Sequence, residues 1–314
     1  MTISKLFPMA LTAFVGATLL LTACKEDENP GTTTGQLNVE ITDGPIDDAS
    51  VKGAFVTVAE VKVDGETFYG FSGKKTINLL NYQQGNVAAL GLGALETGNY
   101  HNISLVLDHQ ADDSGNSPGC YILTDDNVKH SLAASAKQTL ILGKNFVVDA
   151  GQKTDLVVDF DLRKSIQYQN GASDKYDFVA APDLQSAVRL VVKNNAGDIQ
   201  GSCQNTMVNT DKIIVYAYKK GEFNRDVEMQ AQNGIAFKNA VSSAVVGNNG
   251  SFHLSFLEAG EYELHLAAYN DGNSDGQLDL QGTLLLNSLI NLENIRLDAG
   301  AELQLDILVT GILL

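Results

Sequence analysis

The chain has 314 residues, of which 44% are hydrophobic and 19% are charged, and its formal net charge is −17. This composition is typical of a globular protein and excludes an intrinsically disordered chain. The negative charge excludes nucleic acid as an expected partner, because such a surface repels a polyanion. The sequence contains no tryptophan, which disfavours a carbohydrate-binding module built on stacked indole rings.

The N-terminal 23 residues have the order of parts found in a secretory signal. Lys5 precedes an apolar run from Leu6 to Leu21, and the small residue Ala23 comes directly before Cys24. The apolar run is shorter than a typical membrane-spanning helix, and acidic sequence follows it at once. We therefore expect residues 1–23 to be a signal peptide that is removed.

The sequence Leu21-Thr22-Ala23-Cys24 resembles the lipobox of bacterial lipoproteins. The resemblance implies that the Cys24 thiol is acylated, for example with palmitate, that the chain is cut in front of it, and that the lipid holds the protein on a membrane. Each buried methylene contributes about 0.8 kcal/mol to such an anchor. The alternative is an ordinary signal peptide with a cysteine there by chance.

Directly after the cysteine stand Lys25, Glu26, Asp27 and Glu28. A lysine followed by acidic residues resembles the surface-export tag of some Gram-negative lipoproteins. This resemblance implies an outer-membrane protein that faces the cell surface. The alternative is a solvated charge run in a tether, with the protein facing the periplasm. Residues 24–35, which end in NPGTTTG, are predicted to be this lipidated, acidic and flexible tether.

From residue 36 onward, apolar and polar residues alternate in a series of short segments. This period of two predicts strands of antiparallel sheets with one buried face and one solvent-exposed face. The segments are 37–41, 55–63, 103–107, 156–162, 252–256, 262–266 and 303–309. Residues 87–96 are expected to form one or two helical turns, with a flexible turn at Gly91-Leu92-Gly93.

Frequent strands and turns predict an all-β protein with two antiparallel β-sandwich domains. The polar segment KNNAG, Lys193–Gly197, is the best candidate for the boundary between them. The predicted domains are therefore residues 36–193 and residues 194–314.

The first predicted domain resembles a family of uncharacterised all-β domains found in bacterial lipoproteins. The resemblance rests on VEITDGPIDDASVKGAFVTVAEVKV at residues 39–63, GNY at 98–100, DFDLRKSI at 159–166 and PDLQSAVRLVV at 182–192. Gly44 stands where the family's "TDAP"-like turn usually has alanine. The resemblance implies architecture and location, and it assigns no activity.

The second predicted domain resembles prealbumin-like and carboxypeptidase-regulatory-like β-sandwiches. The segments that carry this resemblance are DIQG at residues 198–201, IIVYAY at 213–218, NGSF at 249–252 and LEAGEYEL at 257–264. It implies a fold and no function.

The best candidate for a metal site is the loop that starts at Asp271. Its oxygen-bearing residues occupy the spacing of an EF-hand-type calcium loop, with glycine at the sixth position; they are Asp271, Asn273, Asp275, Gln277 through its carbonyl, and Asp279. Gly282 replaces the usual bidentate glutamate, and no flanking helices are predicted. The sequence therefore leaves two alternatives open, a calcium-binding β-loop and an acidic hairpin turn.

Two cysteines remain after lipidation, Cys120 and Cys203. In an oxidising compartment they could form a disulfide that joins the two domains, and the alternative is two buried thiols. The histidines lack an HExxH pattern, and His253 and His265 are expected to be neighbours on exposed strand faces. No nucleophile elbow, P-loop or dinucleotide-binding motif is present.

These observations predict a lipid-anchored binding or structural module without catalytic activity. Its expected partners are the membrane, through the lipid, and a protein or glycan that the sequence does not identify. One alternative is a fibre subunit or adhesin assembled by strand donation, with the apolar segment Leu303–Leu314 either donated to the next subunit or retained as the last core strand. A second alternative is a hydrolase or accessory protein that acts on surface polymers.

Overall fold

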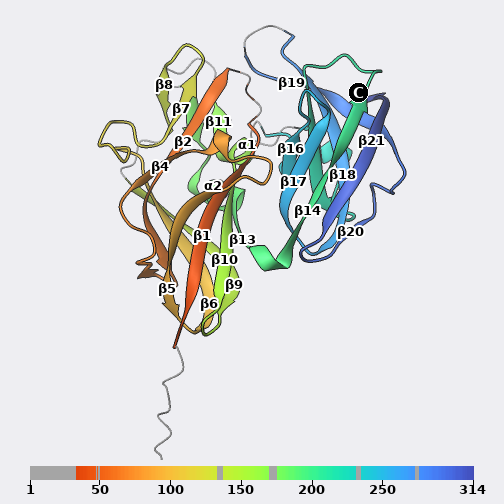
Figure 1. The fold of residues 1–314 in the computed structure, drawn as a ribbon. Helices are drawn as coiled ribbons and strands as arrows, with labels where there is room; N and C mark the ends of the chain where they lie inside the picture. The colour runs from red at the N-terminus through yellow and green to blue at the C-terminus, as the bar shows by residue number, and fades with distance from the viewer. Residues whose placement is uncertain are drawn as a thin grey trace, which may run out of the picture. The chain divides into compact units, whose positions relative to one another are not determined.

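The computed structural model describes residues 33–46, 48, 50–132, 137–169, 175–230, 235–272 and 276–314. Strands dominate this part of the chain and the helices are short, so the predicted all-β fold is confirmed (Figure 1). Residues 32–314 form one compact unit. No helix in the described ranges has both the length and the apolar character needed to cross a membrane.

Two sheets pack together in the first half. One has the strand order β13 (Val188–Val192), β10 (Lys153–Asp161), β1 (Thr34–Gly44) and β5 (Ala88–Glu96). The other has the order β8 (Lys129–Ser131), β7 (Tyr121–Thr124), β2 (Val51–Val63), β6 (Gly98–Asp108) and β9 (Lys137–Val148), with β3 (Glu66–Thr67) and β4 (Lys75–Asn78) also paired to β2.

The remaining elements of the first half are small. They are the two-stranded sheet of β11 (Ile166–Tyr168) and β12 (Tyr176–Phe178), and the helices η1 (Leu79–Asn81), α1 (Leu162–Ser165), α2 (Ala181–Ala187) and η2 (Lys193–Asn195).

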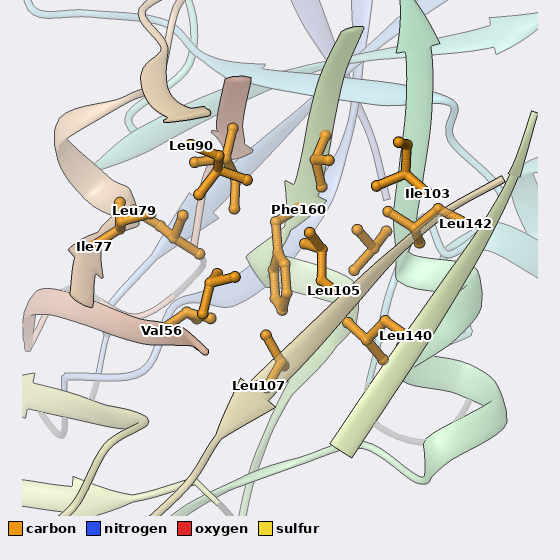
Figure 2. Packing of buried hydrophobic residues seen from close by; sticks show 14 of the residues in the cluster. Val56, Ile77, Leu79, Leu90, Ile103, Leu105, Leu107, Leu140, Leu142 and Phe160 are labelled. Atoms are coloured by element: carbon orange, nitrogen blue, oxygen red, sulfur yellow. The ribbon is translucent and has the colours of Figure 1, made fainter. Parts of the chain in front are cut away.

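The core between the two sheets comes from the predicted alternating residues. Phe160 of β10 is fully buried, and Figure 2 shows its ring near Leu105 of β6, with Val56 and Leu140 from neighbouring strands around them. In β2 the alternation predicts Phe55 on the buried face, but Phe55 is only partly buried. The reason is a register shift between Val58 and Glu60, which exchanges the two faces of the strand.

The predicted helical turns at residues 87–96 are wrong, because residues 88–96 form β5 and pair antiparallel with β1. The glycines of this segment serve close packing within a strand. A Cβ atom on Gly91 would lie 2.7 Å from the carbonyl oxygen of Gly70, and one on Gly93 would lie 2.5 Å from the Gly70 Cα atom.

The second half is one hydrogen-bonded sheet, with one strand outside the main order and one short helix. Its order is β16 (Ser242–Val245), β15 (Lys212–Lys219), β18 (Gly260–Asn270), β19 (Asp279–Ser288), β21 (Glu302–Leu313), β14 (Ala196–Asn205) and β17 (Ser251–Glu258). β20 (Ile295–Leu297) pairs with β18, and helix α3 covers Arg225–Glu228. β16 and β17, the first and last strands, contact each other, so the sheet curls around its own core.

The expectation of purely antiparallel sheets needs one correction in each half. β1 pairs parallel with β10, and β14 pairs parallel with β21. In both halves the first strand pairs parallel with a strand that comes much later in the sequence. Its other neighbour, β5 for β1 and β17 for β14, is antiparallel. A parallel neighbour requires a long connection, which alternation within single segments cannot indicate.

The predicted domain boundary falls in η2, between β13 and β14. Most buried residues of the large clusters belong to one half or the other, but a small cluster contains Val157 and Val191 from the first half and Phe256 from the second. Independent folding of residues 36–193 and 194–314 therefore stays a prediction.

The C-terminal segment is a core strand of its own chain. β21 pairs with β14 on one side and with β19 on the other, and Leu305, Ile307 and Val309 are buried. Of the two sequence hypotheses for residues 303–314, the structure has the last core strand rather than a free donor strand.

Candidate functional site

The family-like motifs TDG and DFDLRKS meet at one place in the structure. Parallel pairing sets Thr42 beside Asp159, Asp43 beside Phe160 and Gly44 beside Asp161. A Cβ atom on Gly44 would lie 3.5 Å from Asp161 Oδ1, an ordinary contact, so the alanine that is usual in the family-like turn would also fit.

The carboxylates at this place are matched by three cations, and we call the five residues Asp159, Asp161, Arg163, Lys164 and Arg189 the charge clamp. Arg163 Nη2 and Lys164 Nζ each lie 3.3 Å from Asp161 Oδ2. Arg189 Nε donates to Asp159 Oδ2 at 2.7 Å. Buried charges are tolerated when they are paired in this way.

The same cations donate to backbone carbonyls of the second half of the chain. Arg163 Nη1 donates to Ala236 O at 2.7 Å, and Lys164 Nζ donates to Ala240 O at 2.6 Å. Arg189 Nη1 donates to Phe256 O at 2.8 Å. The charge clamp therefore joins the two halves, and its donors are used by the protein's own backbone rather than presented to a substrate.

Two carboxyl groups in this region have shifted pKa values of opposite sign. Burial favours a raised pKa for Asp161, but the charges of Arg163 and Lys164 outweigh it and lower the pKa. Burial raises the pKa of Asp43 well above its usual value, because the hydrogen bonds from Gln83 and the Leu162 amide do not compensate for it.

A groove lies where β18 and β19 separate in the second half. The two strands pair from Ala267 to Asn270, and β20 pairs with β18 from Gly260 to Tyr262. Residues 263–266 of β18 therefore pair with neither β19 nor β20, and this edge of the strand borders the groove. One backbone group on this edge has a partner, because the Leu264 amide donates to Leu292 O at 2.8 Å. On the other side, β19 pairs only with β21 from residue 284 to 288.

We call this hollow the forked groove. Its volume is about 670 Å³. Half of the residues that line it are leucine or isoleucine, and polar residues supply most of the other half; the aliphatic ones are Leu264, Leu266, Leu284, Leu285, Leu286, Ile290, Leu292 and Leu313. The volume lies within the usual range of ligand sites. An apolar hollow between two strand edges is suited to a ligand that offers both apolar side chains and backbone hydrogen bonds.

Two polar atoms in the wall of the forked groove are buried without a hydrogen-bond partner, His265 Nε2 and Thr283 Oγ1. The His265 ring stacks on Phe223 with 3.6 Å between ring centroids, and its Nε2 lies 3.7 Å from Glu263 Oε2. Burial lowers the pKa of His265, so the ring is neutral at neutral pH. A bound ligand can satisfy both atoms.

Sequence reasoning did not find the forked groove. The available signal was the run Leu284-Leu285-Leu286, which breaks the alternation expected of a strand with one exposed face. Three consecutive leucines in a strand place apolar side chains on both faces. Leu285 is 42% exposed, although it is part of a regular strand.

The predicted calcium loop is only partly described. Asn273 and Asp275 lie outside the described residues, while Asp279 begins β19. Asp271 Oδ2 accepts from the Gly276 amide, and the Gln277 side chain donates to Asp48. Within the described ranges, no group of three or more His, Cys, Asp or Glu residues could hold a metal ion. Calcium binding stays a prediction.

The two cysteines are not joined. Cys120 and Cys203 are buried free thiols, and they belong to different hydrophobic clusters. The alternative of two buried thiols is therefore the one that the structure contains. Burial raises the pKa of Cys120 to about 12 and that of Cys203 to about 11, so both remain protonated at neutral pH.

The two histidines that the sequence places near each other do not share one environment. His253 Nδ1 lies 3.1 Å from Gln84 O, while His265 stacks on Phe223, so the two histidines have different surroundings. Cys24, Lys25, Glu26, Asp27 and Glu28 lie outside the described residues.

We predict that Arg163→Met lowers the free energy of unfolding by about 3–5 kcal/mol, because it leaves the buried Asp161 carboxylate short of a partner. Arg296→Met is the control, since Arg296 forms an exposed pair with Asp298 and its loss should cost less than about 1 kcal/mol. Urea unfolding measures both values. Equal effects would contradict the role of the charge clamp.

Asp43→Asn should change how stability depends on pH. The raised pKa of Asp43 means that the folded protein binds this proton more tightly than the unfolded chain does. Wild-type stability therefore decreases as the pH rises from about 4 through the raised value, and the asparagine variant lacks this decrease. The variant should become more stable relative to wild type with rising pH.

Asp155→Asn is the control with the opposite sign. Burial opposes ionisation of Asp155, but hydrogen bonds from Lys153 and Asn38 outweigh it and lower its pKa. This variant should lose stability relative to wild type as the pH rises from the lowered value to about 4, and the difference should stay constant at higher pH. Urea midpoints across a pH series test both variants, and parallel curves for Asp43→Asn and wild type would contradict the assignment.

Comparison with known proteins gives one family match, in the first half of the chain, and distant matches to solved structures. A search of curated proteins found no match. Among solved structures, the Bacillus anthracis TIE protein matches with 12% identity over 88% of this chain and 34% of its own, at a TM-score of 0.18. This chain spans 26% of a leucine-rich repeat protein from Bacteroides thetaiotaomicron.

Two further solved structures are matched over nearly their whole length. The minor pilin GBS52 of Streptococcus agalactiae has 10% identity over 89% of this chain and 98% of its own, at a TM-score of 0.19. The fimbrial anchor protein Mfa2 of Porphyromonas gingivalis has 10% identity over 87% and 95%, at a TM-score of 0.20. Scores this low carry no argument about function.

Residues 34–180 match the family described as a domain of unknown function, DUF4382, over the region where the sequence resembles uncharacterised lipoprotein domains.

Proposed function

We propose that this protein is a lipid-anchored module of the bacterial outer surface that binds a partner in the forked groove and catalyses no reaction. The single observation that carries the binding function is the pair of strand edges that face each other across an apolar hollow. Unpaired strand edges are a liability that proteins normally cover, so an edge left open beside a hollow is suited to recognition.

The anchor is supported by the sequence before the described residues. The signal-like segment, the lipobox-like Cys24 and the acidic residues after it all agree with a lipoprotein carried to the surface. The first strand begins at Thr34. A tether of about eleven residues reaches at most about 40 Å when extended. The bound partner would therefore be held close to the membrane.

The absence of catalysis is supported by how the charged residues are used. Active sites are expected where buried titratable groups face a cleft. In this protein the buried Arg163 and the half-buried Lys164 and Arg189 donate to backbone carbonyls of the same chain. Half of the residues that line the forked groove are aliphatic, and these position a ligand without reacting with it.

Substitution of the lipidated residue tests the location. We expect Cys24→Ser to abolish palmitate labelling and to move the full-length protein from the detergent phase to the aqueous phase of a Triton X-114 separation. If the serine variant still enters the detergent phase and is correctly cut, the anchor is disproved.

Replacement of Lys25, Glu26, Asp27 and Glu28 by alanine tests the direction that the protein faces. We expect the wild type to be digested by proteinase K on intact cells, and the alanine variant to be lipidated but protected. Thr32→Ala with Thr33→Ala, further along the same tether, is the control and should behave as wild type. A wild-type protein that resists the protease would contradict surface exposure.

A further inference from the structure

We propose that the forked groove takes an extended segment of a different polypeptide, with alternating apolar side chains, as an additional strand between β18 and β19. This inference rests on the proposed binding function and names the class of partner. It follows from the backbone geometry, from the wall of the hollow and from its two unpartnered polar atoms.

The backbone provides a place for one strand. The ladder between β18 and β19 ends at the pair Ala267 and Thr283, and the ladder between β18 and β20 begins at Tyr262. Four residues of β18, from Glu263 to Leu266, and five residues of β19, from Leu284 to Ser288, therefore border the hollow. On this edge of β18 the Leu264 amide already donates to Leu292 O. At about 3.3 Å per residue, these edges match an inserted strand of roughly four or five residues.

The wall of the hollow selects apolar side chains at alternate positions of that strand. Leu264 and Leu266 come from one edge and Leu284 and Leu286 from the other, so both sides of the hollow repeat with the period of a strand. Leu285 and Ile290 are 42% and 43% exposed at its mouth. Burial of such surface is favourable by roughly 25 cal/mol per Å².

Polar atoms inside the hollow give independent support. Thr283 is 5% exposed, and its Oγ1 has no hydrogen-bond partner. His265 Nε2 makes no hydrogen bond either, although Glu263 Oε2 lies 3.7 Å from it. An unsatisfied buried polar atom destabilises the unliganded protein, so a ligand that bonds to it recovers this cost. A lipid chain would fill the volume but would leave these atoms and the strand edges unsatisfied.

We expect the strand to come from another polypeptide, because every strand in the described ranges already belongs to a sheet. β21 is already paired on both edges. The only long apolar run outside the described residues is Leu6–Leu21, and the sequence predicts that it is removed with the signal. The tether after Cys24 is acidic and contains Pro30, so it does not have the alternation that the groove requires.

A displayed library of random nonapeptides, panned on the full-length lipidated protein in detergent, tests the class of partner. We expect enriched peptides to alternate apolar and polar residues and to lack proline. The best of them, made synthetically, should slow amide hydrogen exchange in residues 263–266 and 284–288. The same peptide with N-methyl groups on alternate backbone nitrogens should bind at least tenfold more weakly.

A matched pair of variants ties the binding to the groove. Leu285→Asp, in the groove wall, should weaken peptide binding at least tenfold. Leu308→Asp is the control: Leu308 is 41% exposed, against 42% for Leu285, and lies on β21 outside the groove wall. The control should bind within about twofold of wild type. If Leu285→Asp does not fold, the comparison of the N-methylated peptide with the unmodified peptide on the wild-type protein tests the proposal by itself.

The proposal is overturned if no alternating peptide is enriched, if exchange at the two edges is unchanged, or if both aspartate variants bind alike. A co-purified lipid that excludes every peptide would also overturn it. Self-association that Leu285→Asp abolishes would identify a second copy as the occupant and would overturn it too. Each of these failures is separate from the proposed location, which depends on Cys24 and is measured without any peptide.

Discussion

Every buried backbone N–H and C=O group needs a hydrogen-bond partner, and this constraint organises the second half of the protein. β14 lies between β17 and β21, and β21 lies between β14 and β19, so these strands are paired on both edges. The continuity stops where β18 and β19 separate. The strand edges that remain there border the forked groove rather than a flat surface. The gap in the hydrogen-bonding between β18 and β19 is therefore suited to binding a ligand.

The charge clamp explains why the two halves of residues 32–314 form one unit. The parallel pairing of β1 and β10 brings the conspicuous motifs of the first half to the same end of the sheet. Arg163, Lys164 and Arg189 then donate to carbonyl groups of the second half. The charged motifs that stand out in this sequence therefore hold the two halves of the chain together. The proposed binding groove is instead built with aliphatic residues that form no sequence motif.

Most of the fold could be predicted from local sequence patterns, because alternation reports which face of a strand is buried. The faces of β1 follow it, but the exposed faces predicted for β6 and β10 are wrong, because both faces of these strands are buried from Ile103 and from Leu156 onward. It failed at the bulge of β2, where one added residue exchanges the faces, and at β5, where Gly91 and Gly93 serve close packing. It also could not indicate the parallel pairs, since these depend on contacts between segments far apart in the chain.

The site was less predictable for the same reason. The calcium-like loop and the cysteines were singled out because they are chemically distinctive, yet Cys120 and Cys203 lie in separate clusters. The forked groove is created by the divergence of two strands, and divergence has no signature in a single segment. Only the run of three leucines at 284–286 gave a local sign of it.

Residue-resolved hydrogen exchange of the unliganded protein tests the open edge most directly. The Leu264 amide points toward the groove side, so strand alternation places the Leu266 amide on that side and the His265 amide on the side of β15. We expect Leu266 to exchange at least tenfold faster than His265. Equal protection of the two amides would show that the edge is already paired and would contradict the account.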